Sequence, residues 1–169
     1  MPYRLEIALK PEMVDAEGEG IRRKASDYFG IAIAQVRTVQ ILTIDAALSA
    51  DQLGAVQTEI FTNPVTQTSA YDPLPIPFDW CIWVGYRPGV RDNPGSTAVE
   101  AIEDLLKIRF ARNEAVFTSK RYCLEAAGLQ SSHRGMPGQR LDGLCFRDRP
   151  GRVPLYWTRT KRILHKCGR

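Results

Sequence analysis

A motif whose residue types could bind an anion occurs twice in the chain, 77 residues apart. Each copy has a basic residue and a proline ahead of an aspartate, with a glycine after it; the two sets are Lys10, Pro11, Asp15 and Gly18, and Arg87, Pro88, Asp92 and Gly95. Glycine at a helix start can bring main-chain N–H groups to a phosphate, but a carboxylate there already satisfies the helix dipole and repels anions. The motif therefore predicts a turn and helix entry in preference to a ligand site, with Lys10, Arg87 and Arg91 as a candidate basic contact surface.

Other patterns that carry catalytic chemistry are missing from the first 130 residues. No histidine occurs there, which excludes a Cys–His or Ser–His nucleophile pair. Neither a glycine-rich lysine loop for phosphate nor a G-x-S-x-G sequence is present. We expect the acidic residues Glu100, Glu103 and Asp104 to lie on the solvated face of a helix. The prediction is a chain with no catalytic residue, no cofactor ligand and no metal ligand of its own.

The cysteines and the N-terminal sequence indicate a cytoplasmic protein. No apolar run approaches the roughly 20 residues of a membrane span, and the N-terminus does not resemble a signal peptide. The four cysteines are widely spaced, so we expect reduced thiols, with Cys81 and Cys123 packed in strands. The segment His165-Lys166-Cys167 lacks further ligands at metal-site spacing.

Charge divides the chain at about residue 130. Residues 131–169 contain ten Lys or Arg and two Asp, whereas residues 1–130 contain 13 basic and 17 acidic residues. The tail is also rich in Gly and Pro, and we expect it to be irregular. Its arginines, with Phe146, Tyr156 and Trp157, could bind nucleic acid. Two explanations of the tail stay open: a genuine basic appendage, or a shifted reading frame or broken gene after Gln130.

The first motif is predicted to join a strand at 3–9 to an amphipathic helix at 19–29, in which Ile21, Ala25 and Tyr28 share one buried face. A strand at 36–44, with an irregularity near Gln40, follows. Ser49 and Gln52 then have capping-box spacing ahead of a second helix, whose apolar stripe is Leu53, Val56 and Ile60.

The second motif is predicted to repeat this order after a proline-rich connector. A strand at 78–86 precedes the motif, and a helix follows it, with Thr97 and Glu100 as a capping box and Ala98, Ile102 and Leu105 on its buried face. A more polar strand at 115–122 is expected nearer a sheet edge. The predicted organisation is a first repeat at 1–70, a connector at 71–77, an incomplete second repeat at 78–129 and a basic tail at 130–169.

With these elements in order, residues 3–127 resemble the PurS family and the tandem PurS-like domain at the N-terminus of the large, single-chain phosphoribosylformylglycinamidine synthase. The segments that carry the resemblance are Leu9-Lys10-Pro11 through Asp15 and Gly18, the strand from Val36 to Ile44, the link Asn63-Pro64-Val65-Thr66-Gln67, and Phe78 through Gly95. The resemblance implies an α+β fold of two PurS-like, ferredoxin-like repeats, with antiparallel sheets covered by helices and packed as a pseudo-dimer.

The resemblance also implies a function in purine biosynthesis. The chain would be a non-catalytic scaffold that bridges the synthase and glutaminase domains of an ATP- and glutamine-dependent C–N ligase and assists ammonia transfer. ATP and magnesium would then bind the partner synthase domain and not this chain. The alternatives from the residues themselves are a stand-alone regulatory module and a basic-tailed nucleic-acid binder that uses residues 131–169.

Overall fold

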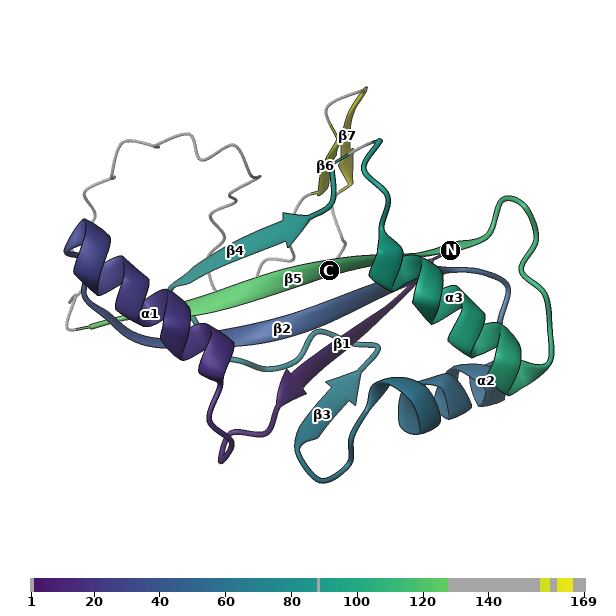
Figure 1. Cartoon of the computed structure of the whole chain (residues 1–169), viewed down its shortest axis with the longest axis horizontal. Helices are drawn as coiled ribbons and strands as arrows, with labels where there is room; N and C mark the ends of the chain where they lie inside the picture. The colour runs from purple at the N-terminus through teal and green to yellow at the C-terminus, as the bar shows by residue number, and fades with distance from the viewer. Residues whose placement is uncertain (1, 88, 128–155, 159–160, 166–169) are drawn as a thin grey trace. The chain divides into compact units, whose positions relative to one another are not determined.

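The computed structural model describes residues 2–87, 89–127, 156–158 and 161–165, and these form an α+β fold (Figure 1). Up to residue 127 the elements are, in chain order, β1 (Tyr3–Leu9), α1 (Ala16–Phe29), β2 (Ile33–Asp45), α2 (Ala50–Ala55), the π-helical turn η1 (Val56–Phe61), β3 (Gln67–Ala70), β4 (Trp80–Gly85), α3 (Asn93–Leu106) and β5 (Ala115–Ala126). The fold class expected from the sequence is therefore confirmed at the level of α+β with a helix-associated antiparallel sheet.

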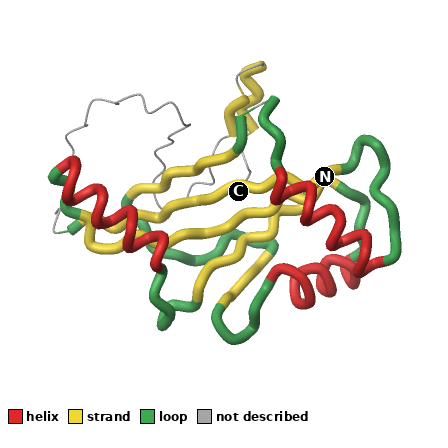
Figure 2. The backbone as a smooth tube through the Cα atoms, viewed as in Figure 1, coloured by secondary structure: helices red, strands yellow, loops and turns green. Residues whose placement is uncertain are grey.

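Five strands form one sheet in the order β3-β1-β2-β5-β4, as labelled in Figure 1. Figure 2 shows the same strands in yellow and the helices in red. Strand β1 is antiparallel to both neighbours, with Leu5 opposite Leu42 and Ile7 opposite Ser69. The pairing of β1 with β2 continues through Gln40 without a register shift, so the irregularity expected there is absent. Strand β5 lies between β2 and β4, one place nearer the edge of the sheet than its counterpart β2, as its more polar sequence predicted. Its polar residues include Thr118, which has a hydrogen-bond partner described below.

The chain forms two compact units, and each unit takes segments from both predicted repeats. One unit comprises Met1–Val14, Val39–Pro75 and Gly89–Lys120, and is called the β1 unit here; the other comprises Asp15–Thr38, Ile76–Pro88 and Arg121–Arg169, and is called the β4 unit. Strands β2 and β5 each pass from one unit to the other partway along their length. Helices α1 and α3 consequently belong to different units.

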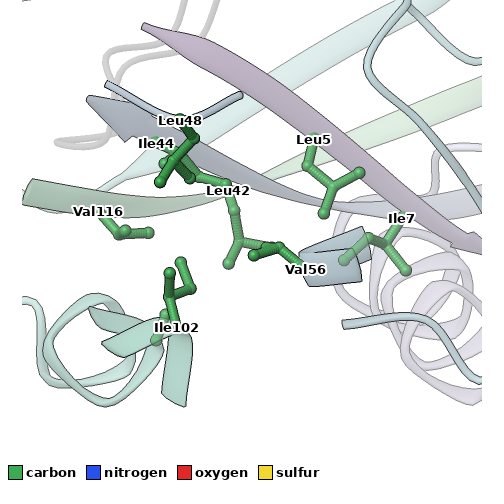
Figure 3. Close-up of a cluster of buried hydrophobic side chains, with 9 residues drawn as sticks. Leu5, Ile7, Leu42, Ile44, Leu48, Val56, Ile102 and Val116 are labelled. Carbon is green, nitrogen blue, oxygen red and sulfur yellow. The ribbon is translucent and has the colours of Figure 1, made fainter. Parts of the chain in front are cut away.

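The β1 unit has an apolar core between its strands and its helices. Strand residues Leu5, Leu42 and Val116 meet Ile102 of α3 and Val56 of η1 in this core (Figure 3). Ile102 and Val56 are fully buried. Ala98 is buried in the same cluster and Leu105 packs against it, which confirms the apolar face predicted for α3. Burying these side chains removes apolar area from water and is the main favourable contribution to the stability of this unit.

In the β4 unit, α1 runs beside the first half of β2 (Figure 1). Ile21 and Ala25 are half-buried, but the Tyr28 side chain is 79% exposed, so its predicted place on the buried face is wrong. The helix ends at Gly30, whose left-handed backbone (φ 63°) directs its N–H back to Ala25 and Ser26. Tyr28 lies in this last turn of the helix. Cys81 and Cys123 are buried and are not joined in a disulfide, which confirms their predicted packing role.

Helix starts follow two different patterns. Ser49 and Gln52 form the predicted capping box of α2. Both motif helices instead begin after an aspartate, α1 after Asp15 and α3 after Asp92. The capping box predicted at Thr97 and Glu100 is therefore wrong, because both residues lie within α3. Helix α1 likewise begins at Ala16, ahead of the Glu19 start that the apolar pattern indicated.

Within the basic tail, the described residues form two short strands, β6 (Tyr156–Thr158) and β7 (Lys161–His165), which pair antiparallel. The expectation of an irregular tail is wrong for these eight residues, and its other residues lie outside the described part of the chain. Among all described helices, none combines the length and apolar character needed to cross a bilayer.

Candidate functional site

The first motif places Asp15 between the start of α1 and strand β2. Its Oδ1 accepts a hydrogen bond from the Gly18 N–H (2.8 Å), and its Oδ2 accepts one from the Thr38 N–H (2.6 Å). Asp15 is buried, and the first turn of α1 closes with the Glu19 N–H donating to the Asp15 carbonyl oxygen. One carboxylate thus caps the helix and ties it to the strand, which we call a clamp.

The second motif builds the same clamp in the β1 unit. Asp92 Oδ1 accepts from the Gly95 N–H (2.7 Å), and Oδ2 accepts from the Thr118 N–H of β5 (2.6 Å). The Thr118 hydroxyl adds a third hydrogen bond, to Oδ1 at 2.8 Å. The corresponding Thr38 hydroxyl oxygen is buried and has no hydrogen-bond partner among the described residues. The two clamps therefore share their main-chain bonds and differ in one side-chain bond.

The motif glycines allow the helix start to approach the strand closely. A Cβ at Gly18 would overlap the carbonyl oxygen of Val36, and a Cβ at Gly95 would overlap that of Val116. Each of these carbonyls lies two residues before the threonine that donates to the clamp aspartate. Any side chain at either glycine would force helix and strand apart and stretch the clamp. Glycine is required at both positions because the helix start lies so close to the strand carbonyl, and not because the backbone has a positive φ.

The clamps determine what these helix N-termini can do chemically. Both oxygens of each carboxylate accept from main-chain N–H groups, and the negative charge lies where a bound anion would sit. A phosphate at either site would meet like charge and occupied donors. The arrangement supports helix entry, the interpretation that the sequence favoured, and leaves the motif aspartates without a free proton-transfer role.

The remaining motif residues lie away from the clamps. Lys10 donates from Nζ to the Pro64 carbonyl (2.7 Å) and from its main-chain N–H to Thr66 (3.0 Å), so it holds the 63–67 turn. Pro11 is exposed in the turn after β1. Arg87 is exposed after β4, and Pro88 lies outside the described residues. Lys10 and Arg91 belong to the β1 unit and Arg87 to the β4 unit, so a shared contact surface of these three residues stays a prediction.

Carboxylates outside the motif also hold the chain together. The Glu103 side chain is only 12% exposed and accepts from the Phe110 N–H (2.7 Å) and from Arg109, so the solvated face expected for it is wrong. These two contacts lower the pKa of Glu103, the Phe110 N–H contributing most. Glu114 bonds the N–H groups of Ala111 and Ala47, which lower its pKa in that order. Both carboxylates hold loop segments through main-chain N–H groups, and these contacts account for their lowered pKa values.

One buried carboxylate explains the path of the connector. Glu6 in β1 is fully buried, forms an ion pair with Arg4 (3.1 Å) and accepts from the Leu74 N–H (2.9 Å). The Tyr71 hydroxyl also donates to the Leu53 carbonyl (2.9 Å), and burial raises the pKa of Tyr71 to about 12. The proline-rich connector is therefore fixed to the β1 unit at two points. Its prolines gave no indication of this attachment in the sequence.

Sequence reasoning identified the clamp aspartates and glycines but missed their strand partners. The signal was present, since Val36-Arg37-Thr38 and Val116-Phe117-Thr118 share the pattern Val-x-Thr. In both strands the valine carbonyl meets the motif glycine and the threonine N–H meets the motif aspartate. The aspartate and threonine are 23 residues apart in the first copy and 26 in the second. The two threonines therefore do not align when the copies are compared at the constant 77-residue spacing of the motif.

Comparisons with known proteins add no further constraint. Scans against family models, curated proteins and solved structures each found no match to this chain. Within the described ranges, no group of three or more His, Cys, Asp or Glu side chains is placed to hold a metal ion.

Proposed function

We propose that this chain is a tandem PurS-like scaffold, the N-terminal assembly part of a phosphoribosylformylglycinamidine synthase in purine biosynthesis. In this role it bridges a synthase domain, which binds ATP and magnesium, and a glutaminase domain, and it assists transfer of ammonia between them. It contributes no catalytic group. The observation that carries the proposal is the clamp, which occurs in both repeats with the same main-chain bonds.

The clamp supports duplication because it matches atom for atom and not only in sequence. In both copies the carboxylate Oδ1 accepts from the glycine N–H, Oδ2 accepts from a threonine N–H, and the glycine faces a valine carbonyl. Two unrelated segments would have no physical reason to share this set of contacts. A duplicated strand–turn–helix–strand unit accounts for it directly.

The division of the chain supports a pseudo-dimer in the same way. The repeat relates β1 to β4, α1 to α3 and β2 to β5. One unit contains β1 and α3, and the other contains β4 and α1. Replacing each element by its equivalent in the other repeat therefore turns the list of elements of one unit into that of the other. In a domain-swapped dimer, each unit contains a strand from one chain and a helix from the other. A chain with two tandem repeats can form the same arrangement within one molecule.

The geometry favours a scaffold over an enzyme because the repeated polar residues are used in holding helices to strands. The motif carboxylates have both oxygens occupied, and the loop carboxylates close turns. What remains for function is surface, including exposed Arg91, which precedes α3 in the β1 unit. We assign contact with the partner domains to Arg91.

Sedimentation velocity with the cognate synthase and glutaminase proteins tests the proposal. We expect the labelled chain to sediment as a larger species when both partners are present. Arg91→Ala should weaken this shift, whereas Lys24→Ala, which removes an exposed positive charge from α1, should leave it unchanged. An unchanged sedimentation coefficient for the folded chain with both partners would contradict the scaffold role.

A further inference from the structure

The two ends of the five-stranded sheet differ in length and chemistry. At one end, β3 is a four-residue strand, Gln67–Ala70, in which all side chains but that of Ala70 are polar. At the other end, β4 has six residues, Trp80–Gly85, none of them charged and none a proline. Among the described strands, β5 is the only one paired with β4, whereas its repeat equivalent β1 has a neighbour on each side. Edge strands usually carry charge, proline or a bulge that prevents further pairing, and β4 has none of these.

The main-chain direction along β4 identifies the groups that face outward. The Asp79 N–H donates to the Leu124 carbonyl of β5 (2.9 Å). Main-chain groups alternate in direction along a strand, so those of Cys81 and Trp83 also face β5. Those of Ile82 and Val84 consequently point to the outer edge. A strand added there must bond to this second set.

The sequence around β4 is complementary to itself when reversed. From Asp79 to Arg87 it reads Asp-Trp-Cys-Ile-Trp-Val-Gly-Tyr-Arg. Antiparallel pairing of two copies about Trp83 puts Asp79 opposite Arg87 at both ends. The inner pairs are Trp80 with Tyr86, Cys81 with Gly85, and Ile82 with Val84. Opposite charges, two aromatic rings and two branched aliphatic side chains are all favourable cross-strand pairs.

We propose that β4 is a homodimer edge, where a second copy of this chain pairs with it antiparallel about a twofold axis at Trp83. In this register Ile82 and Val84 exchange main-chain hydrogen bonds between copies, as their outward direction requires. Shifting the register by two residues in either direction loses the opposition of Asp79 and Arg87. The proposal concerns self-association and does not depend on the scaffold function.

Side-chain exposure on one face of β4 agrees with this pairing. Trp80, Val84 and Tyr86 share that face and are 37%, 42% and 50% exposed. In the paired arrangement each of these side chains gains an apolar neighbour from the other copy. A symmetric interface of this kind is self-complementary, as most dimer interfaces between identical chains are.

Charge exchange at the strand ends provides the first test, by sedimentation equilibrium of the full chain. We expect the wild type to form a dimer of twice the 19.0 kDa chain mass. Asp79→Arg and Arg87→Asp should each weaken dimerisation about tenfold or more, because each puts like charges opposite one another. The double variant should recover affinity, which loss of the Asp79 bond to Ala126 could not produce. A monomeric wild type, or a double variant as weak as the singles, would overturn the proposal.

Disulfide trapping tests the register independently. Residue 83 is the only position that opposes itself, at a spacing of about 4.5 Å between Cα atoms, so Trp83→Cys should form a covalent dimer on mild oxidation. Val84→Cys is the matched control, since its own copy lies beyond disulfide reach, and both variants keep the native cysteines. Under the same mild oxidation, we expect Trp83→Cys to yield at least about fivefold more covalent dimer than Val84→Cys, because only residue 83 lies within disulfide distance of its own copy. Equal yields from two folded variants would refute the register.

Discussion

The difference between the two clamps gives the sharpest prediction, through one substitution made at equivalent positions. Thr118→Val removes a hydroxyl that donates to Asp92 at 2.8 Å, whereas Thr38→Val removes a buried hydroxyl oxygen with no hydrogen-bond partner among the described residues. Both changes keep the side-chain shape and the main-chain N–H that bonds the aspartate. We therefore expect Thr118→Val to lower the free energy of unfolding and Thr38→Val to leave it unchanged or raise it.

The expected sizes follow from these contacts. Thr118→Val loses a hydrogen bond to a charged group, which contributes about 1.5–3 kcal/mol to the free energy of unfolding. Thr38→Val should be neutral or stabilising by up to about 1 kcal/mol, because it replaces an unsatisfied polar atom with a methyl group. Asp92→Ala should cost more, about 2–4 kcal/mol, since it removes the helix cap and leaves the Thr118 N–H without an acceptor.

Urea unfolding followed by tryptophan fluorescence measures these changes, with the m-value checked for each variant. Asp92→Asn is an informative companion, because asparagine still caps a helix while its amide NH₂ cannot accept from a second N–H. We expect a loss of stability smaller than that of Asp92→Ala. Equal effects of Thr118→Val and Thr38→Val, or a cost below about 0.5 kcal/mol for Asp92→Ala, would refute the clamp account.

Three further predictions concern other parts of the fold. Gly18→Ala and Gly95→Ala should each destabilise by more than about 2 kcal/mol in urea unfolding, because the added Cβ overlaps a strand carbonyl, whereas Gly20→Ala, which has open space, should not. Lys107→Gly should stabilise by up to about 1 kcal/mol, since Lys107 ends α3 with a left-handed backbone (φ 53°) that glycine adopts without strain; no gain in unfolding free energy would contradict this. The pKa of Glu19 is lowered from 4.5 to about 2 by hydrogen bonds from Arg22 and then Arg23, so its contribution is present above pH 4.5 and is lost as pH falls toward 2. The difference in Tm between wild type and Glu19→Gln should shrink across that range, and a constant difference would count against the interaction.

The sequence predicted those parts of the fold that depend on local signals. Strand alternation gave β1, and the Ser49 capping box with its apolar stripe gave the second helix. The aspartate and glycine of each motif marked helix entry. The apolar period alone placed the α1 start at Glu19, because the first turn of that helix contributes few apolar residues.

The sequence did not reveal features that depend on contacts between distant segments. The bond from Asp15 to Thr38 spans 23 residues, and that from Glu6 to Leu74 spans 68. The polar sequence of β5 correctly predicted a place nearer the edge than β2, but it did not reveal that the Thr118 hydroxyl bonds the Asp92 carboxylate of the clamp. A polar residue in a strand can therefore have its partner at a helix start.

The scaffold role is tested most directly by the source of nitrogen that a reconstituted synthase can use. The cognate synthase and glutaminase parts, prepared without N-terminal repeats, would be assayed with and without this chain, using either glutamine or ammonium. We predict that the chain raises glutamine-supported product formation and leaves ammonium-supported formation unchanged, because it joins the two domains and supplies no catalytic group. Equal glutamine-supported rates with and without the folded chain would contradict the account.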